Sequence, residues 1–142
     1  MQSIRSRLLI VGAVAALALA VLAPSAAASA RKDFLLAKDC DGLTCVVTSS
    51  TYRGIPVDTV INYTENTEDG TLTAVIHGKN GTATGRCDLS AIFGTPSAPG
   101  SCVFNTGTGA LTQFHLDVDV TVTSADFVSW AWEGSYWMGA GG

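Results

Sequence analysis

Between Leu111 and Thr123 the chain alternates apolar and polar residues, and this alternation predicts a β-strand. Successive side chains of a strand point to opposite faces, so every second residue lies on the same side. One of these faces is entirely apolar and carries Phe114, Leu116, Val118, Val120 and Val122. The other face is mostly polar. We therefore expect a long strand that is buried on one side, in a domain built from strands rather than helices.

Turn signals divide most of the remaining chain into shorter strand-like segments. Asn80-Gly81 is the strongest of them, because both residues tolerate the backbone of a two-residue type I′ hairpin. Further strands are predicted over residues 46–52, 57–64, 72–77, 82–89, 102–105 and 127–138. For residues 31–39 we consider both a single helical turn and a segment that lies along the side of the domain.

These segments predict an all-β domain of about six to eight antiparallel strands. A small antiparallel β-barrel is favoured over a β-sandwich, because closure removes the open edges through which strands aggregate.

Residues 1–30 resemble an export signal. Arg5 and Arg7 precede the apolar run from Leu8 to Leu22, and Ala28-Ser29-Ala30 offers small residues for cleavage. The apolar run is shorter than the roughly 20 residues of a spanning helix, although a retained membrane anchor is the alternative. We predict a signal peptide over residues 1–30, a single secreted β domain over residues 31–142, and no membrane association after cleavage.

The four cysteines all lie within the predicted mature chain. An even number of cysteines in an exported protein favours disulfides over thiols. Three pairings are open, and we favour Cys40 with Cys45 and Cys87 with Cys102, because each pair brackets a turn-rich segment. The cysteines lack the C-x2-C spacing typical of zinc sites, so we predict neither a metal nor a cofactor.

The predicted mature chain is acidic, with six Lys and Arg residues against twelve Asp and Glu residues and a formal net charge of −6. Without a cluster of basic residues it is a poor candidate for binding nucleic acid.

His115, Asp117 and Asp119 share the polar face of the long strand, where they could form a metal or proton-transfer site. A solvated strand face is the favoured interpretation, because the opposite face is the apolar one. His77 ends another predicted strand, just before a hairpin, and could work together with His115. No established catalytic motif accompanies these residues, so we assign no catalytic residue.

Aromatic residues gather near the C-terminus. Trp130 and Trp132 share a face with Val128, which favours packing in the core. Trp137 falls on the other face and is the best candidate for an exposed contact residue. The predicted ligand-binding residues are Trp137, Tyr136, His115 and His77.

The same region carries a resemblance to known proteins. Gly107-Thr108-Gly109, then Phe114, then Trp132-Glu133-Gly134-Ser135-Tyr136 resembles a pattern in small exported bacterial proteins of unassigned function. More remotely, the pattern is similar to the end of barrels of the allene-oxide-cyclase and dirigent type. The resemblance implies a meander of strands closed into a barrel. It implies no active-site residue, because this chain lacks the glycines that usually follow the turn in those barrels.

Three functions are consistent with the sequence. The favoured one is a secreted, disulfide-stabilised barrel that binds a small apolar molecule, a glycan or a protein partner. The alternatives are an enzyme of the barrel-isomerase or cyclase kind that uses His77 or His115, and a structural or inhibitory surface protein.

Overall fold

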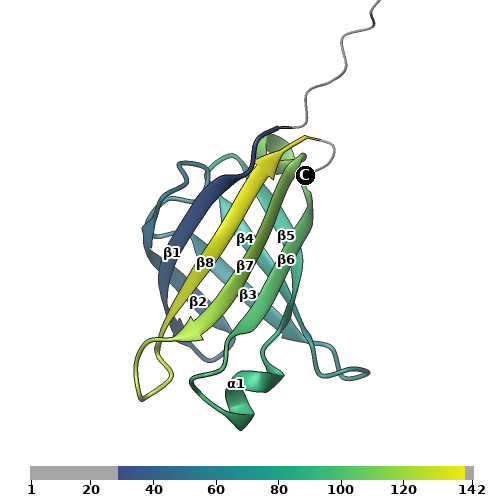
Figure 1. The fold of residues 1–142 in the computed structure, drawn as a ribbon. Coiled ribbons are helices and arrows are strands. Elements are labelled where there is room, and N and C mark those ends of the chain that lie inside the picture. The colour runs from purple at the N-terminus through teal and green to yellow at the C-terminus, as the bar shows by residue number, and fades with distance from the viewer. Residues whose placement is uncertain (1–28, 140–142) are drawn as a thin grey trace, which may run out of the picture.

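A computed structural model describes residues 29–139 as an eight-stranded antiparallel β-barrel (Figure 1). Each strand pairs with the next, and the last strand pairs with the first, so the sheet closes without an edge. The strands are β1 (Lys32–Asp41), β2 (Thr44–Ser50), β3 (Val60–Glu65), β4 (Leu72–Gly78), β5 (Gly81–Asp88), β6 (Gly100–Gly107), β7 (Phe114–Val122) and β8 (Ser129–Met138). The predicted all-β barrel is confirmed.

The segment over residues 31–39 belongs mostly to strand β1, and not to a helical turn. Phe34, Leu36 and Lys38 are buried while the residues beside them are more exposed, which is the period of a strand. β1 pairs with β2 on one side and with β8 on the other, so it closes the barrel. The local sequence alone does not indicate this role, because the partner strand β8 lies at the other end of the chain.

Two short helical elements join the strands. Helix α1 (Ser90–Gly94) lies between β5 and β6, and the 3₁₀ turn η1 (Gly109–Leu111) precedes β7. Each buries one apolar side chain, Ile92 and Leu111 respectively. Neither was expected from the sequence, because elements of three to five residues are too short to show helical periodicity.

The interior of the barrel is filled mainly by alternate residues of every strand. Leu116, Val118 and Val120 of β7 point inward, and Asp117 and Asp119 between them are exposed, as the alternation predicts. On β8, Trp130 and Trp132 are buried, which confirms their predicted place in the core.

Both predicted disulfides are present. Cys40–Cys45 closes the β1–β2 hairpin, in which Gly42 adopts the positive φ that a tight turn requires. Cys87–Cys102 joins directly paired residues of β5 and β6. The larger loop, whose cysteines have a sequence separation of 15, gives the greater entropic stabilisation, about 3 kcal/mol.

The two ends of the barrel differ. The end near the chain termini is filled by an aromatic cluster: the ring of Tyr52 stacks on Phe114 at 5.2 Å between centroids and lies 4.6 Å from that of Tyr136. The opposite end carries α1, the β1–β2 hairpin, and the β3–β4 and β7–β8 loops (Figure 1). We call it the α1 end.

Residues 1–28 of the predicted signal peptide lie outside the described residues. Within residues 29–139, no helix is long and apolar enough to span a membrane. The two disulfides fit an oxidising, extracellular environment.

Candidate functional site

Lys38 places a basic side chain inside the barrel. It follows Phe34 and Leu36 on the inward face of β1, and only 2% of its surface is exposed. Burying an ammonium group costs several kcal/mol unless an opposite charge compensates it. Within residues 29–139 the one described ion pair joins Arg86 to Asp69, so Lys38 has no carboxylate partner.

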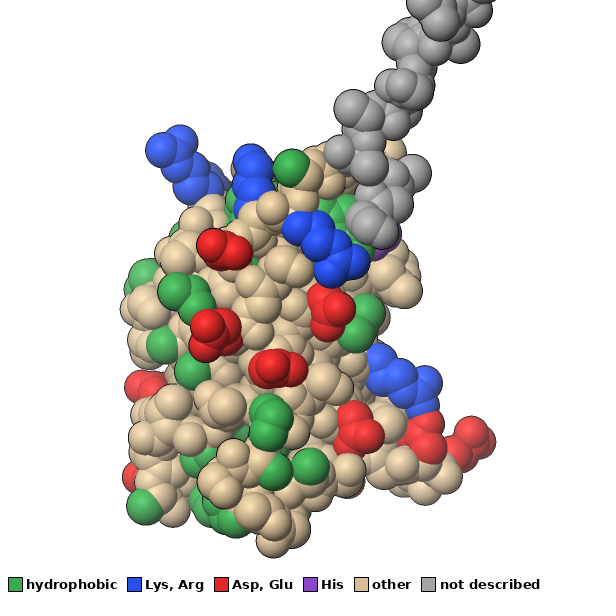
Figure 2. Space-filling view, in the orientation of Figure 1, with side chains coloured by type: hydrophobic (Ala, Val, Ile, Leu, Met, Phe, Trp, Pro, Cys, Tyr) green, Lys and Arg blue, Asp and Glu red, His purple; other side chains and the backbone are tan. Residues whose placement is uncertain are grey.

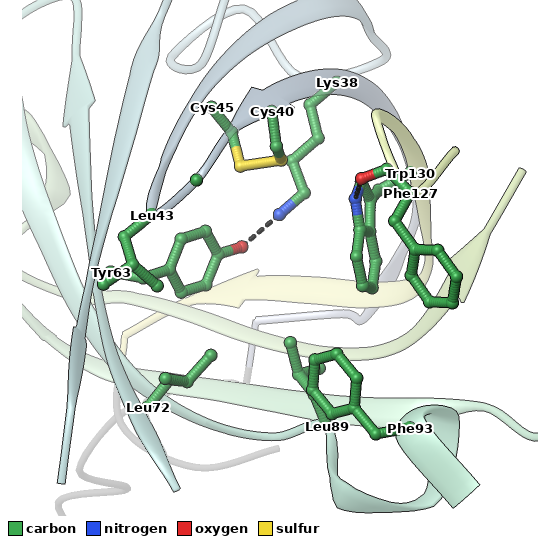
Figure 3. A pocket seen from close by; sticks show the side chains of 11 residues that line it. Lys38, Cys40, Leu43, Cys45, Tyr63, Leu72, Leu89, Phe93, Phe127 and Trp130 are labelled. Atoms are coloured by element: carbon green, nitrogen blue, oxygen red, sulfur yellow. Dashed lines mark hydrogen bonds between the residues drawn. A yellow bond between two sulfur atoms is a disulfide. The ribbon is translucent and has the colours of Figure 1, made fainter. Parts of the chain in front are cut away.

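The polar partner of Lys38 is Tyr63 on β3. Lys38 Nζ donates a hydrogen bond to the phenolic oxygen of Tyr63, which is itself buried (Figure 3). Nζ also lies 4.4 Å from the centre of the Tyr63 ring and 4.5 Å from the centre of the Trp132 ring. Aromatic faces attract a cation, but they do not neutralise its charge. An ammonium group has three donors, so most of its capacity stays free.

Trp132 adds a second unsatisfied donor beside Lys38. Its indole Nε1 is buried and has no hydrogen-bond partner among the described residues. A buried N–H group without an acceptor costs about 1–3 kcal/mol. The surroundings of Lys38 thus hold more donors than acceptors, and the group that complements them is an oxygen acceptor such as a carboxylate or a carbonyl.

Burial changes the titration of both polar side chains. Desolvation lowers the pKa of Lys38 to about 7, because the interior disfavours the charged amine. Desolvation also raises the pKa of the Tyr63 phenol, which therefore stays protonated at neutral pH. The free amine form of Lys38 is therefore much more accessible near neutral pH than that of an ordinary lysine.

A pocket of about 100 Å³ gives access to Lys38 from the α1 end (Figure 3). Apart from Lys38 and Tyr63 its walls are mainly apolar. They comprise Cys40, Gly42, Leu43, Cys45, Leu72, Leu89, Phe93, Phe127 and Trp130. An apolar cavity of about 150 Å³ can hold benzene, so the pocket itself accommodates a small group.

A larger surface hollow of about 490 Å³ continues from the pocket between α1 and the β3–β4 loop. The two share Leu43, Leu72, Leu89 and Phe93 in their walls. Phe93 and Leu43 are 69% and 45% exposed. Figure 2 shows hydrophobic side chains at the surface at this end of the molecule. The pocket thus has a polar floor at Lys38, and the wall of the hollow combines the shared apolar side chains with the polar residues Glu65, Asn66, Thr67, Thr71 and Ser90.

The four ligand-binding residues predicted from the sequence do not line this pocket. His115 and Trp137 lie side by side on the outer face of β7 and β8, with ring centroids 5.2 Å apart and planes 6° from parallel. The guanidinium of Arg31 lies 4.1 Å from the centre of the Trp137 ring. Trp137 is half-buried in this stack, rather than freely exposed.

Tyr136 and His77 occupy two other places. Tyr136 belongs to the aromatic cluster at the opposite end of the barrel. His77 is exposed at the end of β4, where its Nε2 lies 3.1 Å from the amide nitrogen of Asn62. β5 and β6 separate β4 from β7, and both histidines point outward. The assignment of these four residues to ligand binding stays a prediction.

Lys38 and Tyr63 were missed by the sequence reasoning, although a signal for each exists. Once residues 32–41 are taken as a strand, Lys38 shares a face with Phe34 and Leu36, and a lysine on an apolar face is unusual. Tyr63 follows Ile61 on the inward face of β3 in the same way. For metal binding, no cluster of three or more His, Cys, Asp or Glu residues occurs within residues 29–139.

Comparisons with protein-family models, curated proteins and solved structures find no match to this chain. The resemblance to exported bacterial proteins and to dirigent-type barrels therefore stays a prediction.

Proposed function

We propose that this protein is a secreted binding module for a small amphipathic molecule that carries a carboxylate. The acidic group would bind Lys38 at the floor of the pocket, and the apolar part would lie against the side chains of the α1 end. The observation that carries this proposal is the buried Lys38 amine, which has no carboxylate partner among the described residues and is reached by an apolar pocket.

Charge and hydrogen bonding support a carboxylate over a neutral or basic ligand. The Lys38 ammonium loses much of its hydration in the barrel, and a ligand carboxylate would supply the missing charge. The N–H group of Trp132, whose ring is 4.5 Å from Lys38 Nζ, still lacks an acceptor.

The size of the pocket supports a ligand with a slender chain. About 100 Å³ at Lys38 accepts a carboxylate and the first few carbons, and the neighbouring hollow accepts a longer apolar part. This is a narrower form of the favoured binding role for a small apolar molecule, and it uses the opposite end of the barrel from Tyr136.

The test is a titration of ¹⁵N-labelled protein with hexanoate, followed through the indole N–H resonances of the three tryptophans. We expect the Trp132 resonance to shift and the Trp137 resonance, on the outer face, to stay unchanged. 1-Hexanol, which has the same chain without the charge, should bind at least about tenfold more weakly.

Two variants complete this test. Lys38→Met should abolish hexanoate binding while it keeps an apolar side chain of similar length in the core. Lys79→Met, at an exposed position on the β4–β5 turn, should bind like the wild type. Equal affinity for hexanoate and 1-hexanol, or unchanged binding by Lys38→Met, would show the proposal to be wrong.

A further inference from the structure

We propose that Lys38 also captures apolar aldehydes covalently, as an imine formed on its Nζ within the pocket. This inference rests on the proposed function, because the aldehyde must reach Lys38 by the route that we propose for a carboxylate. It goes further by assigning a reactive nucleophile and a second class of ligand to the site.

The geometry supplies what an amine nucleophile needs. Lys38 Nζ lies at an apolar pocket that is open to solvent at the α1 end, so a small carbonyl compound can approach it. No carboxylate holds the amine as an ammonium ion within the described residues. The amine is also buried, whereas Lys32 and Lys79 are exposed, so the chain contains its own reference lysines.

The protonation state agrees with this geometry. An amine reacts only when its nitrogen has a free electron pair, and desolvation in an apolar pocket is an established way to free it. With its pKa lowered to about 7, Lys38 is a free amine at neutral pH far more often than an ordinary lysine. An ordinary lysine with a pKa near 10.4 has only about one free amine in 2,500 at that pH.

The reaction is balanced without any further reagent. The electron pair of Nζ attacks the carbonyl carbon, a C–N bond forms, and the π pair of the C=O bond moves to oxygen. One proton passes from nitrogen to that oxygen and gives a carbinolamine. The hydroxyl group then takes up a second proton and leaves as water while the C=N bond forms and nitrogen loses its remaining proton. The aldehyde and the amine thus become an imine and one water molecule.

Tyr63 is placed to assist the loss of water. Its hydroxyl is hydrogen-bonded to Lys38 Nζ, so it lies next to the atom on which the carbinolamine forms. Burial raises the pKa of the phenol and keeps it protonated, so its O–H can donate a hydrogen bond that orients and stabilises the departing hydroxyl. In this role the Tyr63 hydroxyl would contact the reacting atoms directly.

Few other titratable groups face Lys38. On β1 and β8 the neighbouring Asp39 and Glu133 are exposed on the outer face. On β2 the inward Cys45 is held in a disulfide with Cys40 of β1. On β3 the residue that faces Lys38 is Tyr63, and Glu65 beyond it is exposed. The pH dependence of imine formation should therefore follow Lys38 itself.

The experiment is reductive trapping with hexanal and cyanoborohydride, read by intact mass and by peptide mapping. At pH 7 we expect hexylation of Lys38, distinguished by peptide mapping from hexylation of the α-amino group, to be at least about tenfold faster than that of Lys32 or Lys79. The preference for Lys38 over Lys32 and Lys79 should be largest near pH 7 and should shrink toward pH 10, because the exposed lysines then also become free amines. Lys38→Met should lose this fast modification.

Tyr63→Phe separates the role of the phenol from the shape of the pocket. We expect this variant to trap hexanal at least about tenfold more slowly than the wild type at saturating hexanal, where the rate no longer depends on how tightly the aldehyde binds. If the wild type and Tyr63→Phe trap hexanal at the same rate, Tyr63 does not assist the loss of water, and the proposal of an imine at Lys38 still stands.

The outcomes for binding and for trapping are independent. If Lys38 binds hexanoate but is modified no faster than the exposed lysines, the imine is wrong and the proposed function stands. If hexanal modifies Lys38 rapidly but hexanoate does not bind, the carboxylate role is wrong. If neither occurs, both proposals are wrong.

Discussion

At the scale of single residues, Lys38 is the position where stability and function conflict. In the folded barrel the Lys38 ammonium contacts one phenol and the faces of two aromatic rings. These contacts stabilise the charge less than hydration does in the unfolded chain. An apolar residue in its place would avoid this cost. A lysine kept at such a position is therefore a good indicator of a site that binds or reacts.

The desolvation of the Lys38 amine makes the stability of the barrel depend on pH. In the unfolded chain Lys38 has its ordinary pKa of 10.5, so it stays protonated between pH 7 and pH 10. In the folded barrel Lys38 has lost this proton over the same interval. The free energy of unfolding should therefore rise with pH in this interval, by up to about 1.4 kcal/mol per pH unit. Urea unfolding at pH 7.5 and pH 9.5 measures this rise.

The variant Lys38→Met provides the control for this prediction. It lacks the titrating amine, so the difference in unfolding free energy between pH 7.5 and pH 9.5 should be about 2 kcal/mol smaller than in the wild type. It should also be the more stable protein at pH 6. An identical pH dependence in both proteins would mean that Lys38 is not desolvated.

At the scale of the elements, β7 and β8 approach each other closely where β8 has a glycine. Gly134 pairs with Val118, and a Cβ atom at Gly134 would collide with the carbonyl oxygen of Asp117 and come within 2.8 Å of the Val118 Cα. These are backbone atoms, which cannot move aside as a flexible side chain can. The absence of a side chain at Gly134 thus permits this approach of the two strands.

Gly134→Ala should therefore destabilise the barrel by about 1–3 kcal/mol, as overpacking does in a well-packed core. Gly94→Ala is the matched control, because a Cβ atom there meets nothing within 4 Å. That variant should stay within about 0.5 kcal/mol of the wild type. Chemical denaturation of both variants measures the difference, and equal stabilities would contradict the close approach at Gly134.

At the scale of the whole molecule, the barrel is filled at one end and accessible at the other. Tyr52, Phe114 and Tyr136 fill the end near the termini, whereas a pocket leads to Lys38 from the α1 end. In a barrel of eight strands the side chains leave room for little more than one small ligand. Any ligand of Lys38 should therefore enter past α1.

A bulky residue at the α1 end tests this route. Leu43→Trp adds an indole to the wall of the pocket at a position that is 45% exposed, so the larger side chain can be accommodated without disturbing the core. We expect at least about tenfold weaker binding of hexanoate. Val57→Trp, on the β2–β3 loop and 52% exposed, should bind as the wild type does. If Val57→Trp weakens hexanoate binding and Leu43→Trp does not, the entrance to the pocket lies elsewhere.

The sequence by itself determined the class of the fold and favoured the disulfide pairing that the structure shows. Alternation along residues 111–123 and turn signals such as Asn80-Gly81 are local, and a strand or a hairpin forms from residues that are close in sequence. The predicted hairpin is present, but the prediction of a type I′ turn is wrong: Gly78 pairs with Gly81, so the turn residues are Lys79 and Asn80, and neither Asn80 nor Gly81 has a positive φ. Among the three pairings that the sequence left open, the favoured one is present; Cys40–Cys45 encloses a tight turn, whereas Cys87–Cys102 encloses a longer connection that contains α1.

Only the tertiary structure decided where the candidate site lies. Lys38 becomes an interior residue because β1 pairs with β8, and this contact joins the two ends of the described chain. Before closure the same face of β1 is simply one side of a strand; its sequence shows that Lys38 shares this face with Phe34 and Leu36, but not that the face is enclosed. The physical reason is that burial is a property of the closed barrel, whereas alternation is a property of each strand.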